Sequence, residues 1–387
     1  MIHIDGLQGH MRKNLSGNSS YESFVPVSLE KIVPLELDDR TTLALTACSR
    51  KMGELRGMAR FLPNADMYLT MYVRKEALLS SQIEGTQCTL DDVLDPEGAA
   101  REEEVADVVR YVGATDYAVE EMNRTPISKR LLKNVHRRLL QGVRGSDKEP
   151  GELRHSQNWI GPGGSTISNA PYIPPNPEDM MDALSDLEAF INSDIDIDPI
   201  VKAALVHYQF ETVHPFLDGN GRLGRLLITL CLIDWGVLDA PVFYPSYQLK
   251  LRRSEYYEHL MDVRVNGRYQ EWIRFFCEAM ESAANDSLTS MGRLVDLHAR
   301  DTAAIDSGGT VGGPNAHLFL SALEETPIVT VSSVMKRLGI GRTTASNLVN
   351  RFCELGILRL RDEGKKRYRS FIYEDYLAIL REDSEPL

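Results

Sequence analysis

The chain has 387 residues, of which 43% are hydrophobic and 26% charged. This length exceeds the size at which one hydrophobic core usually keeps growing, so we expect two or three domains, and the composition argues against general disorder. The formal net charge of -13 makes the whole molecule a poor non-specific binder of nucleic acid, although it leaves room for a local basic module.

Membrane and disulfide classes are disfavoured. The chain has no run of about 18 apolar residues, and its first residues lack a basic segment followed by an apolar one. The five cysteines are scattered and include no C-x-x-C pair, so we expect reduced thiols. These features predict a cytoplasmic protein with no membrane association.

The N-terminal third is predicted to be largely helical. Residues 1–25 are polar and are expected to form an arm over the surface, and a helical pattern runs from about residue 38 to 95. Within it, a long helix over residues 67–84 is expected to stop at Gly85, because glycine tolerates the left-handed conformation that ends helices.

Further helices are predicted between residues 102 and 142. The segment 150–177 then changes character, since Gly161-Pro162-Gly163-Gly164 separates two short stretches of strand-forming residues. This pattern predicts a small β-hairpin within an otherwise helical region.

Two helices are expected to bracket a glycine-rich turn at residues 218–221. The first begins at Asp198-Pro199, where aspartate can cap free N–H groups and proline suits the first turn. In the second, the apolar residues of 223–231 recur at helical spacing, which predicts one buried stripe that ends near Gly236.

Residues 214–225 place a histidine, a carboxylate, the glycine-rich turn and two arginines at the start of that second helix. Free N–H groups and the helix dipole favour anions there, and glycines let the main chain come close to a phosphate. Arg222 and Arg225 are three residues apart, so they share a face and can both reach terminal phosphates. His214 is the candidate base and Asp218 the candidate Mg²⁺ ligand.

The run His214-Pro215-Phe216-Leu217-Asp218-Gly219-Asn220-Gly221-Arg222-Leu223-Gly224-Arg225 resembles the signature of the Fic family, H-P-F-x-[D/E]-G-N-G-R-x-x-R. A looser likeness covers about residues 21–280. The resemblance implies that His214 is the general base, that Asp218 binds the metal, and that ATP is the substrate. It also implies that Gly219, Asn220 and Gly221 hold the α-phosphate, with Arg222 and Arg225 on the β- and γ-phosphates.

Residues 80–85 resemble the family's inhibitory pattern, [S/T]-x-x-x-E-[G/N], in Ser80, Glu84 and Gly85. The resemblance implies an ion pair between Glu84 and Arg225 that occupies the arginine needed by the γ-phosphate. The alternative is a helix-ending glutamate in solvent, because exposed ion pairs contribute little.

The predicted hairpin, with Ser165, Thr166 and Ile167, resembles the family flap, on which an extended target segment adds as a strand. A purely structural hairpin is the alternative. Tyr257 and the neighbouring tyrosines are candidates for the adenine pocket, and they are equally compatible with a helix core.

The C-terminal part is predicted to be a separate unit. Residues 301–315 contain four glycines and few apolar residues, which fits a flexible linker. Residues 328–373 hold ten Lys or Arg and three Asp or Glu, a local charge of +7, and two short helices and a basic hairpin there resemble a winged helix-turn-helix. Such a unit can bind DNA, or it can serve in dimerisation or docking.

We therefore predict a mostly α protein with a Fic-type helical bundle, a small β-hairpin flap and a C-terminal winged helix-turn-helix domain. The predicted boundaries are 1–110 for the N-terminal helical region with its inhibitory helix, 111–300 for the catalytic core, 301–315 for the linker and 316–387 for the winged helix. The implied function is a protein adenylyltransferase that moves AMP from ATP, with Mg²⁺, onto Ser, Thr or Tyr hydroxyls of a target or of the protein itself. The alternatives are a DNA-binding regulator that only senses the nucleotide, and removal of AMP or transfer of another nucleotide. A homodimer is left open.

Overall fold

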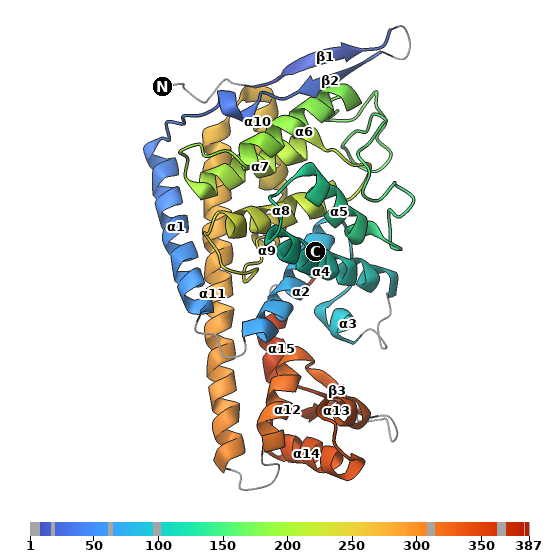
Figure 1. Ribbon diagram of the computed structural model, residues 1–387, viewed down its shortest axis with the longest axis vertical. Helices are drawn as coiled ribbons and strands as arrows, with labels where there is room; N and C mark the ends of the chain where they lie inside the picture. Colours follow the sequence, from blue (N-terminus) through green and yellow to red (C-terminus); the bar gives the residue numbers. More distant parts are fainter. Residues whose placement is uncertain are drawn as a thin grey trace.

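The computed structural model describes residues 8–16, 20–60, 65–95, 102–307, 314–361, 369–382 and 384–386. Its helices dominate the architecture (Figure 1). They are α1 (Asp39–Ala59), α2 (Ala65–Ile83), α3 (Leu90–Leu94), α4 (Glu102–Met122), α5 (Lys129–Leu140), α6 (Pro177–Ile191), α7 (Pro199–Val213), α8 (Asn220–Asp234), α9 (Ser246–Leu251), α10 (Arg253–Asn266), α11 (Tyr269–Ser307), α12 (Pro314–Glu325), α13 (Val331–Leu338), α14 (Arg342–Glu354) and α15 (Glu374–Arg381), with a 3-10 turn at Leu29–Lys31.

The strands form two small antiparallel sheets. β1 (His10–Asn14) pairs with β2 (Tyr21–Val25), and β3 (Ile328–Thr330), β5 (Ser370–Ile372) and β4 (Arg359–Leu360) form a second sheet in that order. The prediction of a mostly α protein is confirmed. The arm expected over the surface is partly buried, because β1 and β2 pair with each other and Ser23 and Phe24 of β2 are buried.

The helices that surround the glycine-rich turn have the predicted bounds. The side chain of Asp198 caps α7 by accepting the N–H of Ile200 at 2.8 Å, and Pro199 occupies the first turn. The single buried stripe predicted for α8 is wrong, since nearly every residue from Arg222 to Leu232 is buried. Helices α2, α4, α5 and α7 all pack against α8, so it has no broad solvent face.

The predicted hairpin at residues 160–172 is not a regular strand pair. Its stems meet in one isolated bridge between Ile160 and Tyr172, and residues 162–169 form turns. Pro162 and Pro171 lack the N–H groups that a longer ladder requires, so the segment remains a loop closed at its base.

Two of the predicted boundaries do not hold in the structure. The limit at 110/111 falls inside α4, and residues 301–307, predicted as linker, are the last turns of α11. Apolar side chains explain the helical ending, because Ile305 and the preceding Leu297 are buried. Residues 308–313 of the predicted linker lie outside the described part of the chain, and α12 begins at Pro314.

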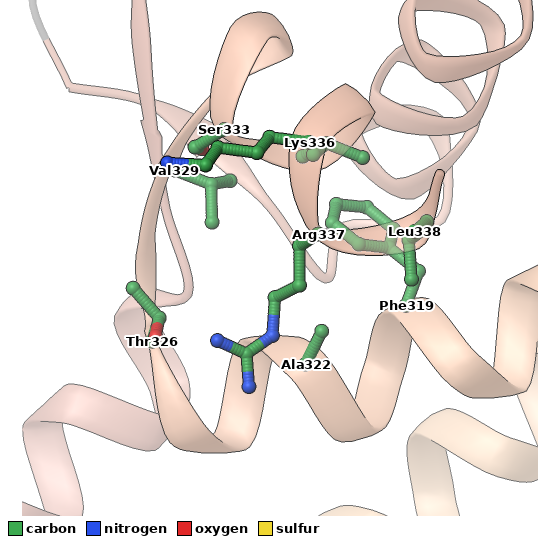
Figure 2. Close-up of a pocket in the computed structure, with 9 residues that line it drawn as sticks. Phe319, Ala322, Thr326, Val329, Ser333, Lys336, Arg337 and Leu338 are labelled. Atoms are coloured by element: carbon green, nitrogen blue, oxygen red, sulfur yellow. The ribbon is translucent and has the colours of Figure 1, made fainter. Parts of the chain in front are cut away.

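The C-terminal unit contains α12 to α15 and the second sheet, and it lies at the lower end of the molecule in Figure 1. The two predicted short helices are present as α13 and α14, while residues 362–368, at the turn of the predicted basic hairpin, are outside the described residues. A mostly apolar cavity of about 340 Å³ separates α12 from α13, and Figure 2 shows Phe319, Ala322, Val329 and Arg337 around it. Assignment of this unit to the winged helix class stays a prediction.

Helix α11 lies beside α1 in the upper part of Figure 1 and continues below the end of α1 to the C-terminal unit, where it contacts α12 and α15. Among the described residues, no helix is both long enough and apolar enough to cross a membrane.

Candidate active site

His214 lies where α7 ends. Its main chain adopts the left-handed conformation with φ 47°, which is rare for a residue other than glycine, and its N–H donates to the carbonyl of Phe210 at 3.0 Å. Burial lowers the pKa of His214 to about 3, with Arg154 and Arg264 acting in the same direction. The imidazole is therefore neutral near pH 7, which is the state that a general base requires.

The loop that links His214 to α8 is held by Asn220. Its Oδ1 accepts the N–H of Phe216 at 2.9 Å, and its Nδ2 donates to the carbonyl of Phe216 at 2.8 Å. The side-chain amide thereby fixes the main chain of the loop at Phe216.

His136 supports the same loop from α5 and was missed by sequence reasoning. Its ring stacks on Phe216 with centroids 3.8 Å apart. Its Nδ1 accepts the N–H of Gly151 at 2.8 Å, so the proton is on Nε2, which donates to the carbonyl of Asp218 at 2.8 Å. Burial lowers the pKa of His136 to about 4, in agreement with this neutral tautomer.

The start of α8 carries the features of an anion site. Gly219 precedes it with φ 75°, a conformation that favours glycine, and the helix then begins at Asn220. Asp218 accepts the N–H of Gly219 through Oδ1 at 2.6 Å, and none of the ion pairs among the described residues involves it. The described residues contain no cluster of three or more potential His, Cys, Asp or Glu metal ligands, so any metal here depends on Asp218 and on ligands from outside the chain.

The two arginines of α8 are both buried, yet their partners differ. Nη1 of Arg222 is 4.0 Å from Oδ1 of Asp107, and its Nε makes no hydrogen bond within the described residues. Burial lowers the pKa of Arg222, whereas Asp107 opposes that effect. Arg222 is thus a loosely engaged cation beside the turn.

Arg225 is tightly engaged by the end of α2. Its Nε donates to Oγ of Ser80 at 2.9 Å, and its Nη2 donates to the carbonyl of Ser80 at 2.9 Å and to Oε1 of Glu84 at 2.7 Å. Burial lowers the pKa of Arg225, but Glu84 together with Tyr256, Tyr257 and Glu211 outweighs burial, and the pKa is raised. Burial likewise raises the pKa of Glu84, and Arg225 reverses the shift, so that carboxylate remains ionised.

The carboxylate of Glu84 lies directly against the first turn of α8. A Cβ atom at Gly221 would be 2.4 Å from Oε1 of Glu84. The carboxylate of Glu84 therefore occupies the start of α8, where the helix dipole favours an anion. Gly85 follows it with φ 97° and ends the inhibitory segment. The Glu84 and Arg225 contact expected from the sequence is present in the structure.

The remaining predicted residues surround this centre less closely. Tyr257 is 39% exposed, and its ring centroid is 4.9 Å from that of the buried Tyr256. Tyr256 and Tyr257 both raise the pKa of Arg225, which places them near the arginine. The hydroxyl of Tyr256 lies 2.9 Å from Nε2 of His207.

Ser165, Thr166 and Ile167 lie in the loop closed by the bridge at Ile160, where the carbonyl of Ser165 accepts Nε1–H of Trp159 at 2.8 Å. At the base of that loop, Nδ2 of Asn158 donates to the carbonyls of His214 at 3.3 Å and of Phe216 at 3.0 Å. The loop is thus anchored to the main chain of the candidate base.

Two family models match this chain. The Fic/DOC family model covers residues 126–232, and the Fic/DOC family N-terminal model covers residues 42–120. A Fic/DOC domain and the Fic/DOC N-terminal region are therefore present in this chain. The predicted family resemblance is confirmed, and every residue of the motif lies inside the first match.

Curated relatives of this protein include the protein adenylyltransferase Fic of Drosophila grimshawi, 30% identical over 216 residues, with 54% of this chain and 41% of the relative covered. The protein of the same name from Drosophila melanogaster is 28% identical over 254 residues, with 64% and 46% covered. The chain spans less than half the length of these relatives.

Solved structures show the fold of this protein. A Fic family protein from Desulfovibrio desulfuricans has a TM-score of 0.54 and 21% identity, with 88% of this chain and 97% of that chain covered. A Fic domain containing signaling protein from Bacteroides thetaiotaomicron has a TM-score of 0.50 and 19% identity, with 64% and 95% covered.

Proposed function

We propose that this protein is an adenylyltransferase that moves AMP from ATP onto hydroxyl groups of proteins and that Glu84 inhibits it from within the chain. The observation that carries the proposal is the placement of a neutral His214 beside a helix start that bears Arg222 and Arg225. The curated relatives named protein adenylyltransferase support the same activity.

The triphosphate is assigned to the start of α8. The main-chain N–H groups of residues 220 and 221 and the positive end of the helix dipole attract anionic oxygens. Arg222 supplies a second source of positive charge, which is only loosely paired with Asp107 at 4.0 Å. Arg225 supplies a second cation once Glu84 has moved away from it.

Asp218 fits a role as the protein ligand of Mg²⁺, because its carboxylate lies at the turn without a cationic partner among the described residues. One carboxylate together with phosphate oxygens and water is a common way for proteins to hold this ion. Bound Mg²⁺ would neutralise charge on the phosphates.

In the proposed reaction, the oxygen of a Ser, Thr or Tyr hydroxyl attacks the α-phosphorus of ATP, and His214 accepts the hydroxyl proton. The new bond joins that oxygen to the α-phosphorus, while the bond from the α-phosphorus to the bridging oxygen breaks and pyrophosphate leaves. General base catalysis of this kind contributes roughly 10²- to 10⁴-fold in rate. Positioning and charge neutralisation supply the rest.

Inhibition follows from competition for Arg225. The guanidinium already donates to Ser80 and Glu84, and the Glu84 carboxylate stands at Gly221, where an incoming phosphate would approach. A γ-phosphate would therefore find Arg225 already hydrogen-bonded and would be repelled by the negative charge of Glu84. Tyr257 is assigned to the adenine side of the site, and the loop with Ser165, Thr166 and Ile167 to docking of the target segment.

The test uses the wild-type protein, Glu84→Gly, and the double variant Glu84→Gly with His214→Ala, each with Mg²⁺ and ATP labelled at the α- or the γ-phosphate. We expect strong labelling of protein only by Glu84→Gly and only from the α-position, with the mass of one adenylyl group added. ATP binding measured by calorimetry should remain within about twofold in the double variant, since His214 acts on the hydroxyl. Label from the γ-position, or no label from a Glu84→Gly protein that binds ATP, would refute the proposal.

A further inference from the structure

Arg154 is buried behind His214 without a carboxylate partner. Only 1% of its surface is exposed, and no ion pair among the described residues includes it. Its donors go to main-chain carbonyls instead: Nε to His214 at 2.9 Å, Nη2 to Pro175 at 2.5 Å and to Val213 at 3.4 Å, and Nη1 to Ser156 at 3.3 Å. A guanidinium buried in this way is costly, so its contacts should serve a purpose beyond packing.

The carbonyls that Arg154 binds belong to the turn at which α7 ends. Val213 and His214 both accept from it, and its own N–H donates to the carbonyl of Pro215 at 3.0 Å. His214 is the residue in the left-handed conformation, which is unfavourable for a residue with a side chain. Three consecutive carbonyls are thus fixed by one arginine across this turn.

We infer that Arg154 is a positioning residue for the proposed reaction, which holds the main chain of His214 in the conformation that serves AMP transfer. The inference rests on the proposed function. Arg154 contacts no reacting atom; it acts through the carbonyls of residues 213–215.

The charged groups that face His214 are Arg154 from the segment before α6, Arg264 of α10 and Glu84 just after α2. The two arginines lower the pKa of the imidazole in addition to burial, whereas the carboxylate of Glu84 and the carbonyl of Glu211 in α7 oppose them. Removal of the Arg154 charge should therefore raise the pKa of His214. This gives a readout that a merely structural arginine would not provide.

The experiment compares Arg154→Lys and Arg154→Met in the Glu84→Gly background. We expect ATP affinity within about twofold of the parent and kcat lower by about 10²-fold in the Met variant, because small misplacements of a catalytic group have effects of that size. The Lys variant retains the charge but only part of the contacts, so its kcat should be intermediate and its pH profile unchanged. In the Met variant the acid limb of the profile, and the NMR titration of the His214 ring, should move to higher pH.

An unchanged kcat in a folded Met variant, or an equal loss of ATP affinity and kcat, would overturn the inference. The NMR titration needs no activity, so it tests Arg154 even if Glu84→Gly proves inactive and the proposed function fails.

A second inference comes from the other side of α2, at the C-terminal end of the chain. In the segment 382–386, of which residues 382 and 384–386 are described, main-chain carbonyls accept from side chains around the inhibitory helix: Glu382 from Nζ of Lys75 at 2.8 Å, Ser384 from Nε2 of Gln82 at 3.0 Å, and Glu385 from Nζ of Lys250. Lys250 also donates to Oε1 of Gln82 at 2.7 Å. Lys75, Gln82, Lys250 and Ser384 are all buried.

Through Gln82, the C-terminal segment contacts α2 at a residue that is two positions before Glu84 in the sequence. Gln82 precedes that glutamate on α2, and after α2 the chain is held again, since Arg381 donates to both carboxylate oxygens of Asp91 at 2.8 and 2.9 Å. Nη1 of Arg74 also donates to the carbonyl of Glu325, the last residue of α12, at 3.2 Å. Figure 1 shows α15 next to α2.

We propose that the C-terminal segment 382–386 is a latch that keeps α2 in its inhibitory position and so couples the C-terminal unit to Glu84. This proposal also rests on the proposed function. If the segment leaves, Lys75 and Lys250 lose acceptors that it provides, and Gln82 loses one of its bonds two residues before Glu84. The end of α2 is then less restrained, and Arg225 is more often available.

The latch is tested by truncation, because its contacts are made by main-chain carbonyls that side-chain substitution does not remove. A chain that ends at Arg381 is compared with a control that ends at Pro386, each with and without Glu84→Gly. We expect the shorter chain to show labelling increased at least about fivefold over the control, and no further increase when Glu84→Gly is already present. Hydrogen exchange of amides in residues 79–85 should be faster in the shorter chain.

Wild-type labelling and wild-type exchange in a folded shorter chain, beside an active Glu84→Gly protein, would overturn the latch. If the shorter chain does not fold, Arg381→Gln replaces it, since that change removes the contacts of Arg381 with Asp91 and Glu374 just before the segment. If Glu84→Gly itself gives no label, the proposed function fails, and hydrogen exchange alone decides on the latch.

Discussion

At the scale of single residues, Arg222 and Arg225 show how two similar side chains acquire different roles. Both are buried and both lie on α8, three positions apart. Arg225 has close partners in Ser80 and Glu84, whereas Arg222 has only Asp107 at 4.0 Å. Arg222 is therefore ready for an anion, while Arg225 also stabilises the inhibited conformation.

We predict opposite profiles for Arg222→Met and Arg225→Met. Arg222→Met should weaken ATP binding by about tenfold or more and change stability little, because few contacts are lost. Arg225→Met leaves Ser80 and Glu84 without their donor and should lower the free energy of unfolding by about 2 kcal/mol. Urea unfolding and calorimetry with ATP check both, and equal destabilisation by the two changes would contradict the assignment.

The sequence predicted the residues of the motif well because that motif is continuous in the chain. His214, Asp218 and Arg225 are brought together by one turn and one helix, and even the contact with Glu84 followed from the resemblance. His136 and Arg154 were not predicted to support the loop. Their partners are main-chain carbonyls from segments far along the chain. Since every residue has such a carbonyl, the amino-acid sequence does not indicate which one is bound.

At the scale of elements, α2 and the turn that follows it contact two different parts of the molecule. Ser80 and Glu84 contact Arg225 of α8, whereas Lys75 and Gln82 contact the C-terminal segment. The bounds of α2 were predicted closely, since Gly85 ends it as expected. Helix α8 and the hairpin at residues 160–172 were predicted less well. The burial of α8 on every side depends on the helices packed around it, which hydrophobic periodicity does not report. The hairpin is not a regular strand pair because its prolines have no N–H group to donate.

Glu76 of α2 offers a prediction about pH. It is buried, and it accepts the N–H and Oγ–H of Ser246 at 3.1 and 2.5 Å. Burial raises its pKa to about 7, above the ordinary value of about 4.3. Between these two values the native state binds more protons than the unfolded state, so stability falls as pH rises and the full cost is present above about pH 7.

Glu76→Gln should remove this cost. We expect the free energy of unfolding of the variant, relative to wild type, to increase by up to about 3 kcal/mol between pH 5 and pH 8. Glu211 also has a pKa of about 7, raised by burial, but it is present in both proteins and cancels in the comparison. Urea unfolding at four pH values checks the prediction, and a constant difference between the proteins would show that Glu76 does not titrate in this window.

At the scale of the whole molecule, the basic C-terminal unit is less available to a polyanion than its sequence suggests. Several of its cations are paired inside the protein, including Arg337 with Glu325, Arg359 with Asp375 and Arg361 with Asp95. The exposed residues of α14 are mostly polar and uncharged, and Arg342 is the one exposed cation there outside the ion pairs of the described residues.

We predict that the full chain binds duplex DNA weakly if the unit is a nucleic-acid module. The slope of log K against log salt should be about -2 to -4, and Arg342→Ala should reduce its magnitude by about one. Fluorescence anisotropy with a labelled duplex at several salt concentrations measures both quantities. Absence of salt-dependent binding would favour the docking or dimerisation role for this unit.

The 39-residue helix α11 has a consequence for how this protein can be divided. It carries buried side chains near both ends, from Trp272 among the N-terminal helices to Leu297 and Ile305 beside the C-terminal ones. At 1.5 Å per residue it is nearly 60 Å long. A cut anywhere along it would expose apolar side chains in one of the two parts that it covers. A fragment made to study the C-terminal unit alone should therefore include the final turns of this helix. For the same reason, an exchange of C-terminal units between related proteins should succeed more readily when the junction lies before Leu294 than in the glycine-rich stretch after Ser307.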